Sequence, residues 1–336
     1  MVSVIYFYAV KSFEKQKNYP KMKHTPQSLS RRVVRSGVDW SGAGQTLSGY
    51  LASRFPYRDA EAWKEIIRAK IITVNGKACQ PETILNLHDV VEYFPGELAE
   101  PPADLNYKVV FEDDSLLVID KPGNLCMHPA GPFFKHTLWH LLCSKYGEIH
   151  FINRLDRETS GLLIAAKNAD TARCFGKREL IREKCYQVLI YGRFEHAGTV
   201  SGFLYSDPAS CVRKKRKFSF EAPDFPAESA RTDFELLNSD GRYSLLRAEL
   251  HTGRMHQIRA TLCSLGYPVV GDKLYGPDEE YYLKQKNELL TAEDRKKLVL
   301  PHQALHSCFL AFEHPEKGDL LSFESEAPFA DLTEIP

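Results

Sequence analysis

The sequence predicts an α+β protein in which helices flank a mixed, mainly antiparallel central sheet, with a small α/β module in front of it. Three observations predict this class. The chain has 336 residues, which at roughly 100 to 200 residues per domain allows about two domains. Short apolar runs typical of strands recur from residue 109 onward, and the helical patterns between them are too irregular for repeated βαβ units. Residues 41–98 carry a separate pattern of two helices and two strands.

Composition and charge exclude several classes of protein. Lys and Arg together number 44, and Asp and Glu also number 44. The formal net charge is therefore zero, and bulk charge does not drive binding to polyanions. No apolar run approaches the roughly 18 residues of a membrane span. Eight scattered cysteines without a C-x-x-C pair indicate neither a zinc ribbon nor a disulfide scaffold, so we expect a cytoplasmic protein with no membrane segment.

The first 40 residues have the composition of a basic arm. Between residues 11 and 36, eight basic side chains accompany a single acid, Glu14, with almost no apolar periodicity. This composition is typical of a disordered segment. The apolar start of the chain lacks the basic region and cleavage site of a signal peptide, so we expect no export. A solvated tail and a polyanion-binding tail both fit residues 1–40.

Residues 41–98 form the predicted small module. Apolar residues recur at helical spacing in segments 47–55 and 62–67, which predicts two short helices. A strand predicted at 71–74 enters an Asn-Gly turn, and a second strand is predicted at 90–94.

The segments TLSGYLASRF and IIRAKIITVNGKACQPETILNLHDVVEYF of this module resemble the RNA-binding domain of small-subunit ribosomal protein S-four. In that family RNA lies against the second helix and the loop that follows it. The resemblance implies phosphate contacts from Lys64, Arg68, Lys70 and Lys77. Alternatively, these side chains only solvate one helix face. Residues 95–102, with three prolines, then predict a linker.

The larger domain is predicted to span residues 105–332. Its strands are expected at residues 109–111, 116–119, 162–166, 186–191, 244–250 and 309–313. The sequence shows no repeat with a period of 20 to 50 residues, which excludes solenoids and propellers. It also lacks the Gly-rich phosphate loops of nucleotide-cofactor enzymes and ATPases.

The densest concentration of reactive side chains lies in FINRLDRETSGLLIAAKN, residues 151–168. Asp156 stands between Arg154 and Arg157 in a polar loop that leads into an apolar strand. A carboxylate flanked by guanidinium groups stays ionised, which suits a nucleophile and disfavours a general acid. Taken alone, an ordinary ion pair in a loop would explain the same pattern.

A second concentration lies in RAELHTGRMHQIRATLCSLGYPVVGDKLYG, residues 247–276. It carries side-chain hydrogen-bond donors that can hold a phosphate and pair a buried carboxylate. These donors are Arg254, His256, Gln257 and Arg259. Two further segments complete the set, Lys184-Cys185-Tyr186 before a predicted strand and PHQALHSCFLAFEHP at 301–315.

Four motifs occur in one order along the chain: R-L-D-x-x-T-S-G; K-x-Y; H-T-G-R-x-H-Q-I-R with a following G-D-x-x-Y-G; and A-L-H-x-x-x-L-x-F-x-H-P. Together they resemble the RluA-type pseudouridine synthases over about residues 105–332. The resemblance implies the pseudouridine synthase fold and the isomerisation of a uridine in structured RNA, either ribosomal or transfer RNA. We expect a monomer that needs no cofactor and no metal.

The resemblance also implies roles for single residues. The essential aspartate falls on Asp156, the base-flipping arginine on Arg154, the stacking tyrosine on Tyr186 and the aspartate-pairing arginine on Arg259. Further substrate contacts fall on Arg254, His256, Gln257 and Lys184. Attack by the aspartate at C1′, attack at uracil C6 and a route through a glycal all stay open. Either Tyr186 or a water is a candidate base for the C5 proton.

Two positions depart from the commonest family pattern. Asn153 and Thr261 stand where histidines are frequent, which affects expected substrate contacts more than activity. The run from Arg213 to Lys217 is either a solvated loop or a phosphate grip formed by Arg213 and Lys214.

Other patterns have simpler explanations. His136-x-x-x-His140 and His302-x-x-x-His306 have metal-compatible spacing, but no H-E-x-x-H accompanies them, so core or surface histidines are favoured. The alternative function is a non-catalytic RNA-binding or ribosome-assembly protein with a degenerate enzyme domain, which the intact catalytic set disfavours. A glycosidase would need a second carboxylate in the same cleft.

Overall fold

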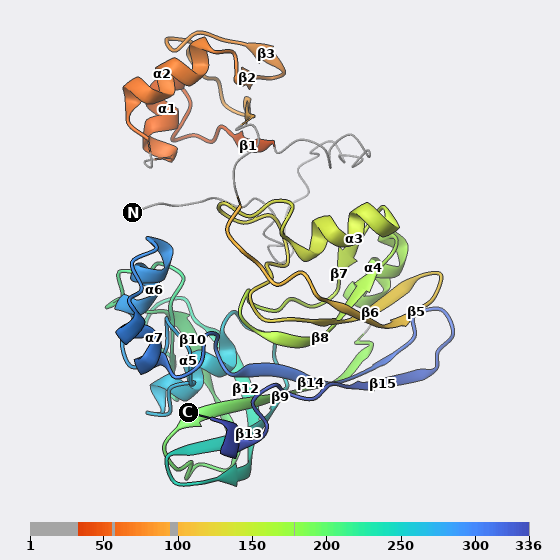
Figure 1. Ribbon diagram of the computed structural model, residues 1–336. Coiled ribbons are helices and arrows are strands. Elements are labelled where there is room, and N and C mark those ends of the chain that lie inside the picture. The colour runs from red at the N-terminus through yellow and green to blue at the C-terminus, as the bar shows by residue number, and fades with distance from the viewer. Residues whose placement is uncertain (1–32, 56–57, 95–99, 178, 336) are drawn as a thin grey trace. The chain divides into compact units, whose positions relative to one another are not determined.

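The computed structural model describes residues 33–55, 58–94, 100–177 and 179–335 (Figure 1). The chain divides into two compact units. The first takes in the residues up to Pro102 together with His128–Gly147, and the second comprises Ala103–Met127 and Glu148–Pro336.

The first unit is built on a small antiparallel sheet with strand order β1-β4-β2-β3. Its elements are β1 (Val34–Gly37), α1 (Leu47–Arg54), α2 (Ala60–Arg68), β2 (Ile72–Val74), β3 (Lys77–Ala78), β4 (Val90–Tyr93) and α3 (Leu138–Tyr146). Both helices α1 and α2 begin at capping side chains, because Thr46 accepts a hydrogen bond from the Gly49 N–H and Asp59 accepts one from the Ala62 N–H. The two predicted helices and the two predicted strands of the module are confirmed.

Aromatic side chains fill the core of this module. Trp63 is fully buried and its Nε1 donates a hydrogen bond to the Phe55 carbonyl at 3.3 Å. The ring of Tyr93 meets Trp63 edge-on, with 5.4 Å between ring centroids. Such an edge-to-face pair adds to the burial energy of both rings.

The predicted basic arm needs a correction at its end. Residues 1–32 of the arm 1–40 lie outside the described residues, as do residues 95–99 of the predicted linker. Val34–Gly37, however, forms β1, which pairs antiparallel with β4, and Val38 is buried. This short strand was not predicted from the sequence because it lies within a run of basic residues. The strand forms because it covers one side of the module core.

Residues 128–147 were predicted to belong to the larger domain, but they group with the first unit. The Glu100 carboxylate accounts for this association, since it accepts backbone hydrogen bonds from Phe134, Lys135 and His136 at 2.7 to 2.8 Å. The His136 ring also contacts the Pro101 carbonyl, at 3.1 Å. These contacts join segments that are more than 30 residues apart, which local patterns cannot reveal.

The second unit is built on a large sheet with strand order β11-β10-β12-β13-β9-β14-β8-β6-β5, to which β15 adds beside β14 and β7 beside β8. Every pairing is antiparallel except that of β14 with β8. The predicted mixed, mainly antiparallel sheet is therefore confirmed.

The strands of this sheet are β5 (Lys108–Glu112), β6 (Leu116–Lys121), β7 (His150–Phe151), β8 (Ser160–Ala166), β9 (Ile181–Tyr191), β10 (Gly198–Ser206), β11 (Arg216–Ser219), β12 (Glu228–Ser239), β13 (Tyr243–Leu250), β14 (Leu305–Glu313) and β15 (Leu320–Glu324). The helices of the unit are α4 (Ala169–Lys177), α5 (Gln257–Ser264), α6 (Glu280–Lys286) and α7 (Ala292–Leu298), with a 3-10 turn at Leu332–Glu334. Helices α5, α6 and α7 gather at the end of the sheet that carries β10 (Figure 1).

The core of the second unit lies around β6, β8 and β14. Leu116, Val118, Leu162, Ile164 and Phe312 are fully buried there in one apolar cluster. No helix in the described ranges is long and apolar enough to cross a membrane.

Gly161 permits the single parallel pairing of the sheet. It lies at the start of β8 with φ +102°, and a Cβ at this position would stand 2.3 Å from the carbonyl oxygen of Ser307 in β14. Only glycine fits both this backbone conformation and this close approach. The pairing fixes the strand onto which the Asp156 loop leads.

Candidate active site

Asp156 lies in the loop between β7 and β8, where the polar sequence predicted a turn into an apolar strand. The preceding Leu155 is buried and anchors the loop, whereas 35 % of the Asp156 side chain is exposed. The carboxylate therefore sits on a fixed backbone but can be reached from solution.

Arg259, from the first turn of α5, holds two carboxylates at once. Its Nη1 donates to Asp156 Oδ2 at 2.7 Å, while its Nε and Nη2 donate to the two oxygens of Asp272 at 2.6 and 2.8 Å. Burial alone would lower the pKa of Arg259, but Asp272 and Asp156 raise it well above its usual range. The guanidinium is thus a permanent cation, clamped by Asp272 and aimed at Asp156.

Asp272 is fully buried in the turn that follows the Gly271 position. Its Oδ1 also accepts the backbone N–H groups of Leu274 and Tyr275 at 2.9 and 3.0 Å. Burial acts to raise the pKa of this carboxyl, but the charge and hydrogen bonds of Arg259 lower it overall. Four hydrogen bonds compensate the buried charge of Asp272. Asp272 therefore fixes the orientation of Arg259 on the side away from Asp156.

His256 faces the second oxygen of Asp156. Its backbone is left-handed, with φ 58°, immediately before α5, and its Nε2 lies 3.7 Å from Asp156 Oδ1. The other ring nitrogen, Nδ1, lies 2.8 Å from the hydroxyl of Tyr275, whose oxygen accepts the Arg216 N–H at 2.8 Å. The tautomer in which the Tyr275 hydroxyl donates to Nδ1 carries its ring proton on Nε2, toward Asp156.

The charges of this cluster settle which groups are ionised. Burial lowers the pKa of His256 to about 4, even though Asp156 opposes the shift. Burial also acts to raise the pKa of Asp156, but His256, Arg259 and Lys214 together lower it. Because His256 is neutral above about pH 4, Arg259 and Lys214 are the cations that keep Asp156 ionised at neutral pH.

Tyr186 lies in β9 and is buried, with 7% of its surface exposed. Burial raises the pKa of its hydroxyl to about 12, although a hydrogen bond with Ser307 opposes the shift, and the Asp156 charge raises it further. The phenol therefore keeps its proton at neutral pH.

Gln257 was predicted to contact substrate, but its amide is fully used within the protein. Its Oε1 accepts from the Thr252 hydroxyl and the Arg254 N–H at 2.8 and 3.0 Å. Its Nε2 donates to the Arg231 carbonyl and the Thr232 hydroxyl at 3.0 and 2.9 Å. Gln257 is buried and ties the H-T-G-R segment to β12, so this prediction is corrected to a supporting role.

Arg154 and Arg254 are both exposed. Arg154 makes no side-chain hydrogen bond or ion pair within the described ranges, so it is free to meet a ligand. The guanidinium of Arg254 instead donates to the Ser229 carbonyl at 3.1 Å and to Glu228 at 3.4 Å. A substrate contact by Arg254 therefore requires exchange of these exposed, weak partners.

The basic run that starts at Arg213 is only partly a loop, because Arg216 and Lys217 belong to β11. Lys214 lies over the ring of Tyr282 at 4.4 Å from the centroid, and its charge acts on both Asp156 and His256. Arg213 is exposed, without a side-chain partner among the described residues.

The four basic residues predicted for the first unit also differ among themselves. Lys64 pairs with Glu61 at 2.8 Å, which reduces its availability for phosphate. Arg68, Lys70 and Lys77 are exposed and form no ion pair in the described part of the chain.

Several supporting residues were not predicted from the sequence. Lys121, at the end of β6, is fully buried and donates to the carbonyls of Pro122, Leu125 and Arg157 at 2.8 to 3.2 Å. Burial lowers its pKa to about 7. Lys121 thus joins the turn that follows β6 to the Asp156 loop.

A second set of hydrogen bonds that supports the Asp156 loop involves Lys273, the residue after Asp272. Lys273 donates to both oxygens of Glu158, at 3.1 and 2.9 Å, and to the Pro301 carbonyl at 2.7 Å. Gln285 also donates to Glu158, at 2.9 Å. The G-D-x-x-Y-G segment therefore positions both Arg259 and the Asp156 loop, although the motif alone does not show to which partners its polar residues bind.

The histidine pairs with metal-compatible spacing do not converge on one point in the described residues. His306 uses Nδ1 for the Ser160 hydroxyl at 2.8 Å and Nε2 for Ser325 at 3.0 Å. The one convergent group among the described residues that could hold a metal is Glu183, Cys185 and Glu249. There, Arg247 donates to Glu183 at 2.7 Å and to Cys185 at 3.1 Å, so a guanidinium already compensates these ligands.

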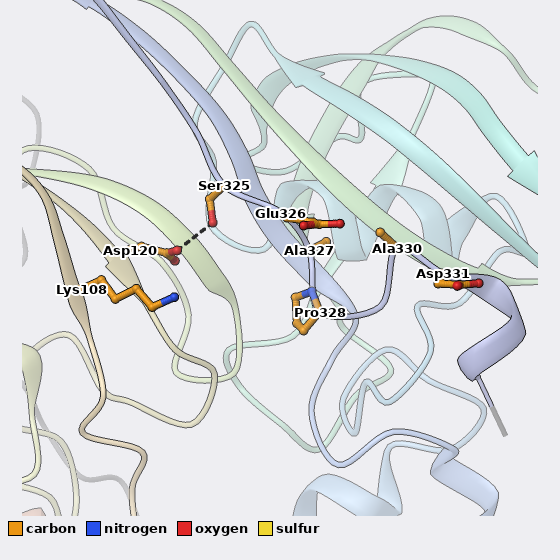
Figure 2. A pocket seen from close by; sticks show the side chains of 8 residues that line it. All are labelled: Lys108, Asp120, Ser325, Glu326, Ala327, Pro328, Ala330 and Asp331. Carbon is orange, nitrogen blue, oxygen red and sulfur yellow. Dashed lines mark hydrogen bonds between the residues drawn. The ribbon is translucent and has the colours of Figure 1, made fainter.

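Two cavities of the second unit are lined by other residues than those of the cluster around Asp156 and Arg259. One, of about 510 Å³, is lined by Lys108, Asp120, Pro328 and Asp331 among others (Figure 2). The other, of about 670 Å³, includes Arg247 and Glu324. Figure 2 shows the Ser325 hydroxyl bonded to Asp120, at 2.7 Å, on the rim of the first cavity. No predicted site residue lines either cavity.

Comparison with known proteins identifies relatives along most of the chain. A family model described as RNA pseudouridylate synthase matches residues 115–264, which contain Asp156, Tyr186 and Arg259. The ribosomal large subunit pseudouridine synthase D of Escherichia coli O6:H1 is 30% identical over 324 residues, covering 91% of this chain and 94% of the relative.

Two further matches agree. An uncharacterized RNA pseudouridine synthase of Chloroflexus aurantiacus is 36% identical over 223 residues, or 63% of each chain, so this chain spans under two thirds of that relative. The solved structure of human RNA pseudouridylate synthase domain containing 1 superimposes with a TM-score of 0.52 at 23% identity, over 69% of this chain and 87% of that one. That likeness shows a shared fold.

Proposed function

Because the chain belongs to the RNA pseudouridine synthase family, it is an isomerase that acts on RNA, and we propose that its target is a uridine of large-subunit ribosomal RNA. The name of the Escherichia coli relative supports this choice of RNA. In the reaction the bond between C1′ and N1 of the uridine breaks, a bond between C1′ and C5 forms, and the C5 proton is lost while N1 regains one.

The observation that carries the proposal is the bridge from Asp156 through Arg259 to Asp272. It supplies an accessible carboxylate that stays ionised, in a fixed direction, with one oxygen bound and the other facing a neutral imidazole. These are the requirements for a carboxylate that acts as a nucleophile or as a base on the sugar. Asp156 is accordingly the proposed catalytic residue, with Arg259 as its partner.

The proposed roles of Tyr186 and Arg154 concern the flipped base. A uridine must leave its stack to reach Asp156, which costs a few kcal/mol, and an aromatic face compensates about 1 to 3 kcal/mol per base. Tyr186 offers that face, and the exposed Arg154 can enter the vacated space. Since the Tyr186 phenol has a pKa of about 12, water is favoured over a phenolate as acceptor of the C5 proton.

The first unit is proposed to bind RNA in the manner of the ribosomal protein S-four domain, through Arg68, Lys70 and Lys77. Its two capped helices followed by a short strand and an exposed basic turn support this assignment. We further propose that the protein works as a monomer in the cytoplasm, without metal or cofactor.

The test is to map pseudouridines in ribosomal and transfer RNA from cells that carry the chain, lack it, or carry Asp156→Asn. We expect at least one large-subunit site to disappear both without the protein and with Asp156→Asn, because the amide keeps the size of the side chain but is a far weaker nucleophile. Lys296→Gln on the exposed face of α7 is the matched control. Full modification by Asp156→Asn would refute the role of Asp156, and loss confined to transfer RNA would refute the ribosomal target.

A further inference from the structure

Lys184, in β9, is a partly buried ammonium group without a counter-ion. No carboxylate or carbonyl within the described ranges lies in hydrogen-bond or ion-pair contact with its Nζ, and burial, the sole cause of its shift, lowers its pKa. The residue is half-buried. Shielding a charge from water without a partner is unfavourable. The Lys184 ammonium therefore does not stabilise the fold, and a function in ligand binding would explain its presence.

Other shielded lysines of the second unit have hydrogen-bond or ion-pair partners. Lys121 has three carbonyl partners, and Lys273 has both oxygens of Glu158 and a carbonyl. Lys167 likewise contacts Glu112 at 2.8 Å and the Asp113 carbonyl. An unpaired, shielded lysine is therefore an exception in this unit, and a ligand is the partner that it lacks.

The position of Lys184 specifies the ligand. Lys184 and Tyr186 are two residues apart on β9, so their side chains project from the same face of the sheet. Strand geometry separates their Cα atoms by about 6.6 Å, a span that one nucleotide can bridge. A nucleotide whose base lies on Tyr186 would present its phosphate to Lys184.

The neighbouring turn places an exposed glycine beside the ammonium. A Cβ at Gly253 would lie 3.6 Å from Lys184 Nζ, and Gly253 itself is exposed. Gly253 therefore adds no side chain that would cover the ammonium. The turn is held in place by Gln257, which binds its neighbours Thr252 and Arg254.

We propose that Lys184 binds a backbone phosphate of the flipped target nucleotide and thereby seats the uridine whose base lies on Tyr186. This inference rests on the proposed function, because it takes RNA as the ligand. It adds a phosphate-binding residue to the site, distinct from the contacts of the first unit.

The test uses mononucleotides, so it depends neither on the identity of the target RNA nor on turnover. Uridine, uridine 5′-monophosphate and uridine 3′-monophosphate are titrated by NMR into the full chain, into Lys184→Gln and into the control Lys296→Gln. We expect the wild type and the control to bind one of the two monophosphates about tenfold more tightly than uridine, as one charge-assisted contact allows. Lys184→Gln should bind that monophosphate no better than uridine, and Lys184→Arg should restore the preference.

Thermal unfolding of the same variants separates ligand binding from a structural role. Removing an unpaired, shielded charge should leave the melting temperature of Lys184→Gln unchanged or raise it. A clear fall in melting temperature would show that Lys184 supports the fold and would overturn the proposal. So would a wild type that binds neither monophosphate better than uridine, or a Lys184→Gln variant that keeps the preference. Failure of the ribosomal RNA assignment would leave these outcomes unaffected.

Discussion

Arg259 is the residue on which both the site and the local fold depend, since it serves two carboxylates. Replacing it by Met leaves Asp272 buried with only backbone partners, which should cost about 3 to 5 kcal/mol of unfolding free energy. Urea unfolding at pH 7.5 measures this loss. The control is Arg157→Met. The Arg157 side chain is 31% exposed and its Nη2 lies 3.3 Å from Glu158, so its replacement should cost under about 1 kcal/mol. Equal losses would contradict the assigned bridge.

The same variant should also reverse a pH dependence. In the wild type the pKa of Asp272 is lowered, so its stabilising contribution is present above its unfolded pKa and fades as pH falls. Without Arg259, burial raises that pKa, and the carboxyl then costs stability as pH rises. Arg259→Met should therefore melt at a higher temperature at pH 5 than at pH 7.5.

A second prediction at this scale concerns the pH dependence of the reaction. The pKa of His256 is about 4 and that of Asp156 is lowered. Single-turnover rates should therefore show no step near pH 6.5, where an unperturbed histidine titrates, and should stay constant between pH 5 and pH 8. Rates measured from pH 5 to 8 on one RNA stem-loop test this. A step near 6.5 that vanishes in His256→Asn would show that His256 titrates normally.

Among single residues, the sequence predicted the reactive side chains but not the residues that position them. A carboxylate between arginines is visible in the order of residues, and so is the cluster around Arg259. Asp272 and Lys273 could be recognised only as members of a motif. Their partners could not be predicted, because the pairing of side chains depends on the three-dimensional path of the turn. Gln257 was misassigned for the same reason, since an amide at a loop can face inward or outward.

At the scale of elements, the pairing of β8 with β14 depends on the Gly161 position. Gly161→Ala would place a Cβ 2.3 Å from a backbone oxygen at a φ of +102°, so we expect a loss of about 2 to 3 kcal/mol in unfolding free energy. Chemical denaturation measures it. The control is Gly176→Ala in α4, where nothing lies within 4 Å and alanine should stabilise by about 0.5 to 1 kcal/mol. A neutral Gly161→Ala would contradict the tight approach.

Strands whose sequence is a continuous apolar run were predictable, whereas several half-exposed strands, such as β11 and β12, were not. The sequences of β6 and β8 are continuous apolar runs, which stand out from their surroundings. Strand β12 alternates buried and exposed residues and is rich in charge, and β11 lies inside the basic run. For such edges and half-exposed strands, hydrogen bonding to a neighbour decides the conformation, and the neighbour is distant in sequence.

At the scale of the whole molecule, a net charge of zero conceals local basic surface. Exchanging Arg68, Lys70 and Lys77 together for Gln should flatten the slope of log affinity for RNA against log salt by about 0.7 to 0.9 for each phosphate that the variant no longer neutralises. Filter binding to a ribosomal RNA fragment between 50 and 200 mM salt measures the slope. Lys64→Gln should change it little, because Lys64 is paired with Glu61. An unchanged slope in the triple variant would mean that the module does not bind RNA through this surface.

The parallel pairing of β8 with β14 joins segments that are synthesised at different times. Ser160 and its partner His306 are 146 residues apart, so the strand that anchors the Asp156 loop lacks its neighbour until that distant segment has left the ribosome. Adding the 146 residues from Ser160 to His306 takes roughly 7 to 30 s at about 5 to 20 residues per second. During that interval β8 has no β14 beside it, so the strand onto which the Asp156 loop leads gains its parallel neighbour late in synthesis.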